Sequence, residues 1–425
     1  MNKKEIKKDF RTFISSGKTD TFERYGMDVV MGKREGCYFW DIDRKHKWIN
    51  CHSNGGVFNL GHHNPIIREA LVKGSETYDI GNHHFISERR AALGKKIAEL
   101  MPEDLDCTVF GVSGGEATDL AIKLARGYTK RNNIISAIGG YHGHTGFSLA
   151  AGDLQYREPF GEMAPGFKQI PFNDIAAMES AINKDTAAVI LETIPATLGI
   201  YIPDKDYLKN VKELCKKNGA LLILDEVQTG LGRTGKLWGF QNFNVVPDIV
   251  VLGKGLSGGM YPMSATVFRK PLETFFNKNP FIHVSTFGGS ELGAEVTLKV
   301  LEISSEPKFL KNVNQMAEYL SKGYKVLAGK YHDHIVGFRQ LGLMTGIEFR
   351  TENYGLLFTK AAYQSGLFTL YSNNDKRVCQ LLPPLIIGKE QVDEIIHKID
   401  IAIPKLKLYN IAFSIKEFID NLKVF

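Results

Sequence analysis

The sequence predicts an α/β fold with a large, mostly parallel sheet between helical layers and a smaller α+β domain built from both ends of the chain. Two observations support this prediction. Several short segments are β-branched and almost wholly apolar, without polar alternation, so both faces of the sheet should be covered. These segments alternate with stretches that carry apolar residues at helical spacing. The 425 residues suffice for two domains at about 150 residues per domain.

The predicted elements follow one another in a simple order. A short amphipathic helix begins the chain, and residues 36–43 are expected to form a strand that runs into an acidic turn. Helices are expected over 66–80 and 87–100, where apolar residues recur at helical spacing. Beyond residue 305 we expect a hairpin over 336–349 and helices over 389–422. The strands of the large sheet are expected at 107–112, 133–138, 187–192, 221–226 and 249–252.

This order predicts how the chain divides into domains. Residues 1–64 are expected to form the N-terminal part of the small domain, 65–305 the large domain, and 306–425 the C-terminal part of the small domain. Most strands of the large domain end in glycine or a polar residue. Open α/β sheets bind their ligands at that edge, so we look for functional residues there.

Composition argues against several classes of protein. The net charge of +6 is spread thinly, and its densest cluster, at residues 3–11, is typical of a solvated helix face rather than a nucleic-acid site. The five cysteines are odd in number and far apart, which predicts neither disulfides nor a metal site. No apolar run approaches the ~20 residues needed to cross a bilayer, and no signal peptide is evident. We therefore expect a cytoplasmic protein that binds neither nucleic acid nor membrane.

Lys254 is the first of four features at strand ends. It directly follows an apolar strand and precedes the glycine-rich stretch 255–259. In a partly dry cleft, desolvation lowers the pKa of a lysine and makes its amine nucleophilic towards aldehydes. Considered alone, such a lysine is more often an exposed loop residue.

The other three features complement this amine. Asp225 closes an apolar strand, where a carboxylate needs a cation such as a protonated pyridine nitrogen, although a structural salt bridge or helix cap is equally compatible. Ser113, Gly114 and Gly115 lead into a helix whose free N–H groups suit a phosphate, although such turns are common. Tyr141 lies in a glycine-rich loop, from which its ring can cover a planar cofactor. Together these groups predict a pyridoxal-phosphate site.

Longer motifs in the same region resemble the class III aminotransferases, the group of ornithine, acetylornithine and omega-amino-acid transaminases. They are the stretch 224–235 (LDEVQTGLGRTG), the segment 247–249 (PDI) and Gly253-Lys254. The similarity extends to 60–65, 141–143, 285–289 and 382–385, and so over nearly the whole chain. The resemblance implies a fold-type I pyridoxal-phosphate enzyme. It also implies a homodimer with shared active sites, acting on a small amine or amino acid and a keto acid.

The resemblance implies a role for each matching residue. Lys254 would form the Schiff base with the cofactor and move the proton, while Asp225 would pair with the pyridine nitrogen. Gln228 would bond the ring oxygen, between Tyr141 on one ring face and Val227 on the other. Thr286 would reach the phosphate from a second subunit. The implied cofactor-binding set is Ser113, Gly114, Gly115, Tyr141, His142, Glu192, Asp225, Val227, Gln228, Lys254 and Thr286.

Departures from the family pattern lie where the family binds substrate. Gln380 stands where members acting on α-amino acids often carry a carboxylate-binding arginine, and Arg377 is displaced from that position. Thr193 follows Glu192 where the family usually has a proline and then a glycine-rich turn, and Ser290-Glu291 replaces the usual Asn-Pro. We therefore expect this protein to share the cofactor chemistry of the family, whereas the resemblance does not identify its substrate.

Amino-group transfer is the function that the sequence predicts. A lyase, racemase or decarboxylase on the same scaffold is the alternative, because such enzymes break a different bond of the same activated substrate. A non-catalytic protein that keeps the fold is a third possibility, but it would be expected to have lost the lysine or the aspartate, and both are present.

Overall fold

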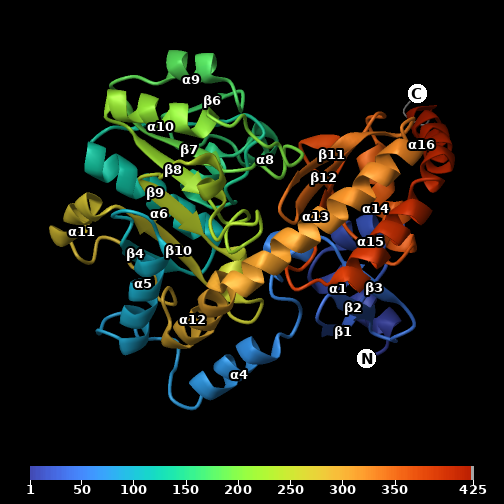
Figure 1. Ribbon diagram of the computed structural model, residues 1–425, viewed down its shortest axis with the longest axis horizontal. Coiled ribbons are helices and arrows are strands. Elements are labelled where there is room, and N and C mark those ends of the chain that lie inside the picture. The colour runs from blue at the N-terminus through green and yellow to red at the C-terminus, as the bar shows by residue number, and fades with distance from the viewer. Residues whose placement is uncertain (423–425) are drawn as a thin grey trace.

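The computed structural model describes the backbone of residues 1–422 and the side chains of residues 1–413. A seven-stranded sheet lies at its centre, in the order β4-β10-β9-β8-β7-β5-β6 (Figure 1). Only β10 runs antiparallel to its neighbours, so the sheet is mostly parallel, as expected. The strands are β4 (Cys107–Gly111), β5 (Asn133–Ala137), β6 (Phe167–Ile170), β7 (Thr186–Glu192), β8 (Leu221–Asp225), β9 (Ile249–Leu252) and β10 (Ser264–Phe268).

All five predicted strands of this sheet are present, with ends that differ from the prediction by at most one residue. Two further strands were not predicted. β6 (FKQI) is an edge strand whose polar side chains hide its apolar pattern. β10 is fully buried, but it follows β9 after a glycine-rich connection instead of a long helix. The repeating strand-and-helix pattern therefore gave no signal for it.

Both faces of the sheet are covered, as the continuous apolar strands predicted. Along β8, Ile223 packs into a cluster with Ala121 and Leu124 of α6, while Leu222 and Leu224 pack into another that contains Val211 of α10. Successive residues of a strand point to opposite faces, so each face needs its own apolar cover. The covering helices are α6 (Gly114–Thr129), α7 (Gly146–Ala151), α9 (Ile175–Ala181), α10 (Tyr207–Asn218) and, beside the sheet, α4 (Pro65–Gly74), α5 (Glu88–Leu100) and α12 (Glu291–Ser305) (Figure 1).

The two ends of the chain share a second core. Ile49 and Cys51 from the N-terminal part pack in one cluster with Leu357 and Phe358 from the C-terminal part. Two four-stranded sheets carry this region: β1 (Met31–Glu35), β2 (Tyr38–Asp41), β3 (Lys47–Asn50) with β13 (Leu367–Phe368), and β11 (Ile335–Leu341), β12 (Met344–Phe349), β15 (Asp375–Leu381) with β14 (Leu370–Ser372). β11 and β12 are the predicted hairpin. The domain limits at 64/65 and 305/306 stay a prediction.

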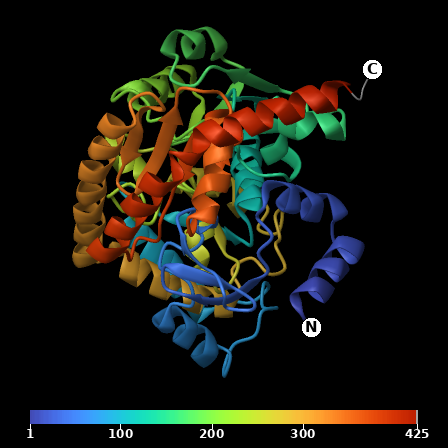
Figure 2. The same ribbon diagram turned by 90° about the vertical axis from the view of Figure 1, so that its right-hand side faces the viewer.

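The helices of this region lie together on one side of the molecule. In Figure 1 the long α13 runs from α12 towards α14, α15 and α16, and Figure 2 looks onto that side, where both chain ends are marked. The predicted first helix is α1, followed by α2, and the predicted C-terminal helices are α15 and α16. The helices are α1 (Lys3–Phe13), α2 (Ser16–Tyr25), α13 (Pro307–Lys330), α14 (Tyr354–Gln364), α15 (Lys389–Ala402) and α16 (Lys405–Leu422), with short ones at α3 (Ser53–Gly56), α8 (Leu154–Arg157) and α11 (Thr274–Asn277).

One predicted helix was too long. The helix expected over 66–80 ends at Gly74, because glycine is followed by Thr77, Tyr78 and Ile80, which favour helices weakly. The strand expected within 36–43 is β2, which ends at Asp41, where the predicted acidic turn begins. There the Asp41 carboxylate accepts hydrogen bonds from the N–H groups of Val30 and Ile42 and turns the chain.

Arg233 connects the segments that surround the ligand edge of the large sheet. Its guanidinium is fully buried and donates to the carbonyl oxygens of Leu343 (3.0 Å) and Pro383 (2.6 Å) and to Oδ1 of Asn59 (2.6 Å). Burial lowers the pKa of Arg233 to about 9. Hydrogen bonds to three distant segments therefore fix how the chain ends sit against the large sheet. Within residues 1–422, the structure shows no helix that is both long and apolar enough to cross a membrane.

Candidate active site

The residues predicted at the strand ends come together in one cavity. It has a volume of about 310 Å³ and lies beyond the carboxyl ends of β5, β7, β8 and β9. Its lining contains ten of the predicted residues: Ser113, Gly114, Gly115, Tyr141, His142, Glu192, Asp225, Val227, Gln228 and Lys254. Thr286, the remaining member of the predicted set, is exposed on the loop before α12 and does not line this cavity.

Lys254 begins the short 3-10 turn η3 (Lys254–Ser257), with only Gly253 between it and β9. Its backbone has φ +42°, a left-handed conformation that costs a non-glycine residue about 1–3 kcal/mol. The Nζ atom donates to Oε1 of Gln228 at 2.9 Å. Burial lowers the pKa of Lys254 from its ordinary value, and the charges of Asp225 and Glu192 oppose this shift. The amine therefore lies inside the cavity, and the direction of its pKa shift favours the nucleophilic form.

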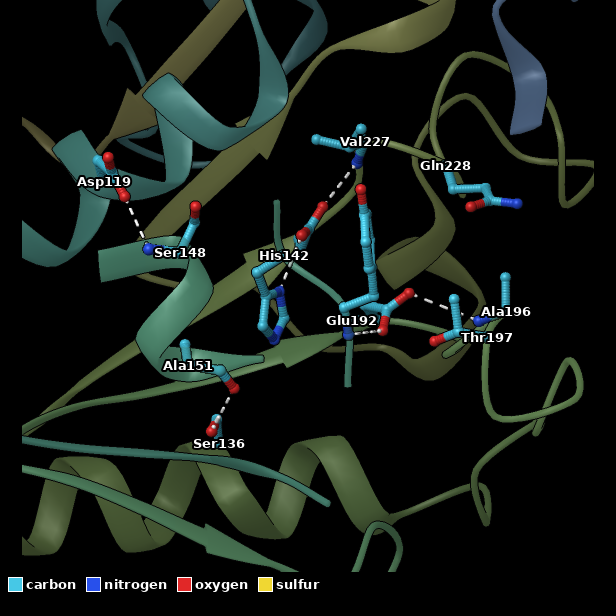
Figure 3. A network of polar contacts seen from close by, with 12 residues as sticks. Asp119, Ser136, His142, Ser148, Ala151, Glu192, Ala196, Thr197, Val227 and Gln228 are labelled. Carbon is cyan, nitrogen blue, oxygen red and sulfur yellow. Dashed lines mark hydrogen bonds and ion pairs between the residues drawn. The ribbon is translucent and has the colours of Figure 1, made fainter. Parts of the chain in front are cut away.

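Asp225 ends β8 with only 6% of its surface exposed. Oδ1 accepts the N–H of Val227 at 3.0 Å, and Oδ2 lies 2.9 Å from Nδ1 of His142 (Figure 3). Burial alone would lower the pKa of His142, but its hydrogen bond and charge interaction with Asp225 raise the pKa above the ordinary value. His142 therefore orients the carboxylate and compensates part of its charge.

Glu192 lies beside Asp225, because the two residues are register partners on β7 and β8. Its Oε1 accepts the N–H of Tyr141 at 3.0 Å, and its Oε2 accepts the N–H of Ala196 at 3.4 Å (Figure 3). Burial is the main reason why the pKa of Glu192 rises to about 7, and the nearby Asp225 adds to the shift. Glu192 thus ties the loop that carries Tyr141 to the segment after β7.

The turn from β4 into α6 also lines the cavity. Ser113 is the N-cap of this 16-residue helix, and its hydroxyl accepts the N–H of Glu116 at 3.2 Å. A Cβ atom added to Gly114 would lie 3.2 Å from Val227, and one added to Gly115 would lie 3.0 Å from Oγ1 of Thr145. Glycines are therefore required by close packing, and their free N–H groups at the helix start suit an anion.

A second chamber of about 470 Å³ adjoins the first and shares Tyr141, His144, Gln228 and Lys254 with it. We call it the outer chamber. Gln380 lies in it, buried, and its Nε2 donates to the carbonyl oxygen of Ala196 at 3.2 Å. Arg377 is exposed and bonded to Asp375, so it does not replace the missing arginine, as the sequence indicated.

Most of the outer chamber was not predicted from the sequence. Its walls come from α2, from the segment after β3 that includes α3, from α8 and from α14. These segments carry no motif of their own, and only the packing of the two chain ends brings them to Lys254. The unpredicted lining residues include Thr21, Phe22, Tyr25, His52, Asn54, Tyr156, Thr197, Leu356, Lys360 and Tyr371.

Comparison with known proteins identifies the family. The sequence pattern of the aminotransferase class-III family matches residues 22–403. The chain belongs to this family. It is 54% identical over 397 residues, 93% of each chain, to an uncharacterized aminotransferase of Archaeoglobus fulgidus. It is 32% identical to a putrescine aminotransferase of Pectobacterium atrosepticum, over 95% of this chain and 89% of that protein.

A solved structure extends the similarity to the fold and the cofactor. The ornithine aminotransferase of Toxoplasma gondii, which shows partial occupancy of pyridoxal phosphate at its active site, superposes with a TM-score of 0.86. It is 25% identical, with 95% of this chain and 94% of that chain covered. The fold-type I architecture expected from the sequence is confirmed, and the protein is a pyridoxal-phosphate-dependent aminotransferase.

The cavity fits this cofactor on its own geometry. A carboxylate for the pyridine nitrogen, an amine for the aldehyde and a glycine-rich helix start for the phosphate line one space of about 310 Å³. The Nε2 atom of His142, a residue that lines this cavity, is buried without a hydrogen-bond partner among the described residues. The lining therefore has a polar atom that lacks a hydrogen bond. The described residues contain no group of three metal-ligating side chains.

Proposed function

We propose that Lys254 and Asp225 are the catalytic residues of this aminotransferase. When bound, pyridoxal phosphate supplies an electron sink that stabilises the charge left on the substrate carbon. The Lys254 amine would hold the cofactor aldehyde between turnovers and carry the proton at Nζ. Asp225 would keep the pyridine nitrogen protonated. The support for both roles is that the two side chains line the same cavity, with the pKa of the amine lowered by burial.

The remaining cavity residues would hold and orient the cofactor. Ser113, Gly114 and Gly115 would bind the phosphate at the start of α6, and Gln228 would donate its amide to the ring oxygen. Val227 and Tyr141 would cover the two ring faces. His142 and Glu192 would act by positioning Asp225 and Tyr141, since each is bonded to that neighbour.

We propose that the enzyme is a homodimer, with Thr286 of one subunit reaching the phosphate site of the other. Thr286 lies on an exposed loop that also carries Phe281, Ile282 and Phe287, all exposed in the single chain. Apolar residues gathered on one loop are typical of a subunit interface. This supports a partner at that surface.

The substrates we propose are a small primary amine or amino acid as donor and a keto acid as acceptor. The replacement of the family arginine by buried Gln380 argues against an α-amino acid as the preferred donor. We also place the enzyme in the cytoplasm, since all five cysteines are free and such thiols are typical of a reducing compartment.

Two measurements test the proposed site and reaction. Borohydride reduction of the holoenzyme followed by peptide mass spectrometry should place the cofactor on Lys254, and Lys254→Ala protein should carry none. With a primary amine and a keto acid, the amino group should appear in the new amino acid. Release of ammonia or carbon dioxide without any amino acid formed from the keto acid would instead support the lyase or decarboxylase alternative, and exchange of substrate stereochemistry would support a racemase.

A further inference from the structure

The outer chamber has an unusual charge distribution. Among the described side chains that line it there is no aspartate, glutamate or arginine. Its basic groups are Lys254, Lys360, His52 and His144. Burial and the neighbouring Lys254 lower the pKa of His52 to about 4, so His52 is neutral at neutral pH. The formal charges of the lining are therefore positive, and Lys254 is committed to the cofactor under the proposed function.

Lys360 is the remaining lysine of this lining, on α14 opposite residues of α2. It is half-buried, and its Cε lies 3.9 Å from the position that a Cβ atom of Gly26 would occupy. Its Nζ lies 5.3 Å from the ring centroid of Tyr409. No carboxylate lies within ion-pair distance of this amine in the described part of the chain. An ammonium group beside a cavity without a counter-charge favours an anionic ligand.

The two carboxylates of the adjoining cofactor cavity do not line the outer chamber. Glu192 and Asp225 line only the cofactor cavity. Both are already bonded, Glu192 to the N–H groups of Tyr141 and Ala196, and Asp225 to Val227 and His142. A second ammonium group on a substrate would therefore meet Lys360 without meeting a free acid from the described lining.

We propose that Lys360 binds a carboxylate at the far end of the amino donor, so that the substrate class is a primary amine with a remote carboxylate and not a diamine. This inference rests on the proposed function. Lys254 lines both chambers, whereas Lys360 lines the outer one alone. A donor whose amine reaches Lys254 and whose chain extends into the outer chamber enters the space that Lys360 lines. Neutral Gln380, close to Ala196, offers no cation for a carboxylate on the reacting carbon.

The test uses three donors of equal chain length with the holoenzyme: 4-aminobutanoate, butylamine and 1,4-diaminobutane. The rate at which each removes the absorbance of Lys254-bound cofactor in a single turnover gives its specificity. The anionic donor should exceed the neutral one by at least about tenfold, as expected for one charge-assisted contact, and the diamine should be slowest. The ratio of the rate with 4-aminobutanoate to the rate with butylamine should fall towards one in Lys360→Met. Lys360→Glu should react faster with 1,4-diaminobutane than with 4-aminobutanoate. Lys325→Met, at an exposed lysine of α13, is the matched control and should keep the wild-type ratios.

A binding measurement separates this inference from the proposed function. Calorimetric titration of the holoenzyme with butanoate needs no turnover, and its affinity should fall about tenfold in Lys360→Met but not in Lys325→Met. If none of the amines reacts while butanoate binds in this way, the proposed reaction is wrong and the anion site stands. If the amines react but the diamine is preferred, or the ratios do not change with residue 360, the anion site is wrong and the aminotransferase proposal stands.

Discussion

Nδ1 of His142 lies 2.9 Å from Oδ2 of Asp225, and both side chains are buried at the carboxyl edge of the large sheet. The contact joins two predicted features, the loop after β5 and the end of β8. This hydrogen bond needs a hydrogen on one of the two atoms, and the raised pKa of His142 favours a proton on Nδ1 that is donated to the carboxylate. The same carboxylate is the one we assign to the cofactor nitrogen, so His142 determines how that carboxylate is presented.

Replacing His142 with Phe should weaken cofactor binding while the protein remains folded. The variant leaves Oδ2 of Asp225 buried without its partner, and loss of a hydrogen bond to a charged group costs about 1.5–3 kcal/mol, or roughly 10- to 100-fold in the dissociation constant. Fluorescence titration of the apoprotein with pyridoxal phosphate measures the change. The pH at which the absorbance of bound cofactor changes should also shift, which a purely structural role would not cause. His332→Phe, at an exposed site, is the control; equal behaviour of the two variants would contradict a positioning role.

Glu192 should make stability depend on pH. Its pKa rises from 4.5 to about 7 on folding, so the folded protein holds a proton that the unfolded chain releases. The stability contributed by this proton is complete below about pH 4.5 and is lost as the pH rises through about 7. The stability of wild type relative to Glu192→Gln should therefore decrease over this range by roughly 2–3 kcal/mol.

Urea unfolding of both proteins at several pH values across this window measures the difference. The comparison cancels the contribution of Glu226, whose pKa burial also raises to about 7. Glu318→Gln, at an exposed position of α13, should show no such dependence relative to wild type. A wild-type curve parallel to that of Glu192→Gln would show that the carboxyl ionises freely in the folded state.

Gly143 should not tolerate a side chain. Its φ of +126° disfavours other residues, and a Cβ atom would lie 2.7 Å from Cα of Gly115. Gly143→Ala should therefore push the loop after β5 against the helix start, with a loss of roughly 1–3 kcal/mol in stability and weaker binding of the cofactor phosphate. Thermal unfolding with and without pyridoxal phosphate measures both effects.

Gly94→Ala is the control for Gly143→Ala. Gly94 lies inside α5, and nothing is within 4 Å of the Cβ atom that alanine would add. Gly94→Ala should stabilise the protein by up to about 1 kcal/mol, because alanine favours the helix. A destabilised Gly94→Ala variant, or an unaffected Gly143→Ala variant, would contradict the packing described for these two positions.

Gln380→Arg should improve the use of α-amino acids. The new guanidinium would lie beside Ala196 in the outer chamber, where it could bind the carboxylate of glutamate bidentately. We expect the KM for glutamate to fall by about tenfold or more. Arg377→Gln should leave it unchanged, since Arg377 is exposed and bonded to Asp375. An unchanged KM in Gln380→Arg would show that the substrate carboxylate does not reach this residue.

The sequence by itself determined the large sheet and the cofactor cavity. Apolar strands such as 221–225 form because their residues need cover on both faces, and that need is local to the strand. Parallel strands then bring their carboxyl ends to one edge, so Asp225 and Lys254 had to lie near each other once both followed such strands. Ten of the predicted residues line one cavity for this reason.

Only the tertiary structure decided the outer chamber. Lys360, Phe22 and Gln380 come from α14, α2 and β15, and no local pattern relates one to another. They meet because the two chain ends share one core and because Arg233 ties residues 59, 343 and 383 together. Contacts of this kind depend on packing between segments hundreds of residues apart. The cofactor could therefore be predicted from the sequence, whereas the charge of the outer chamber is apparent only in the folded protein.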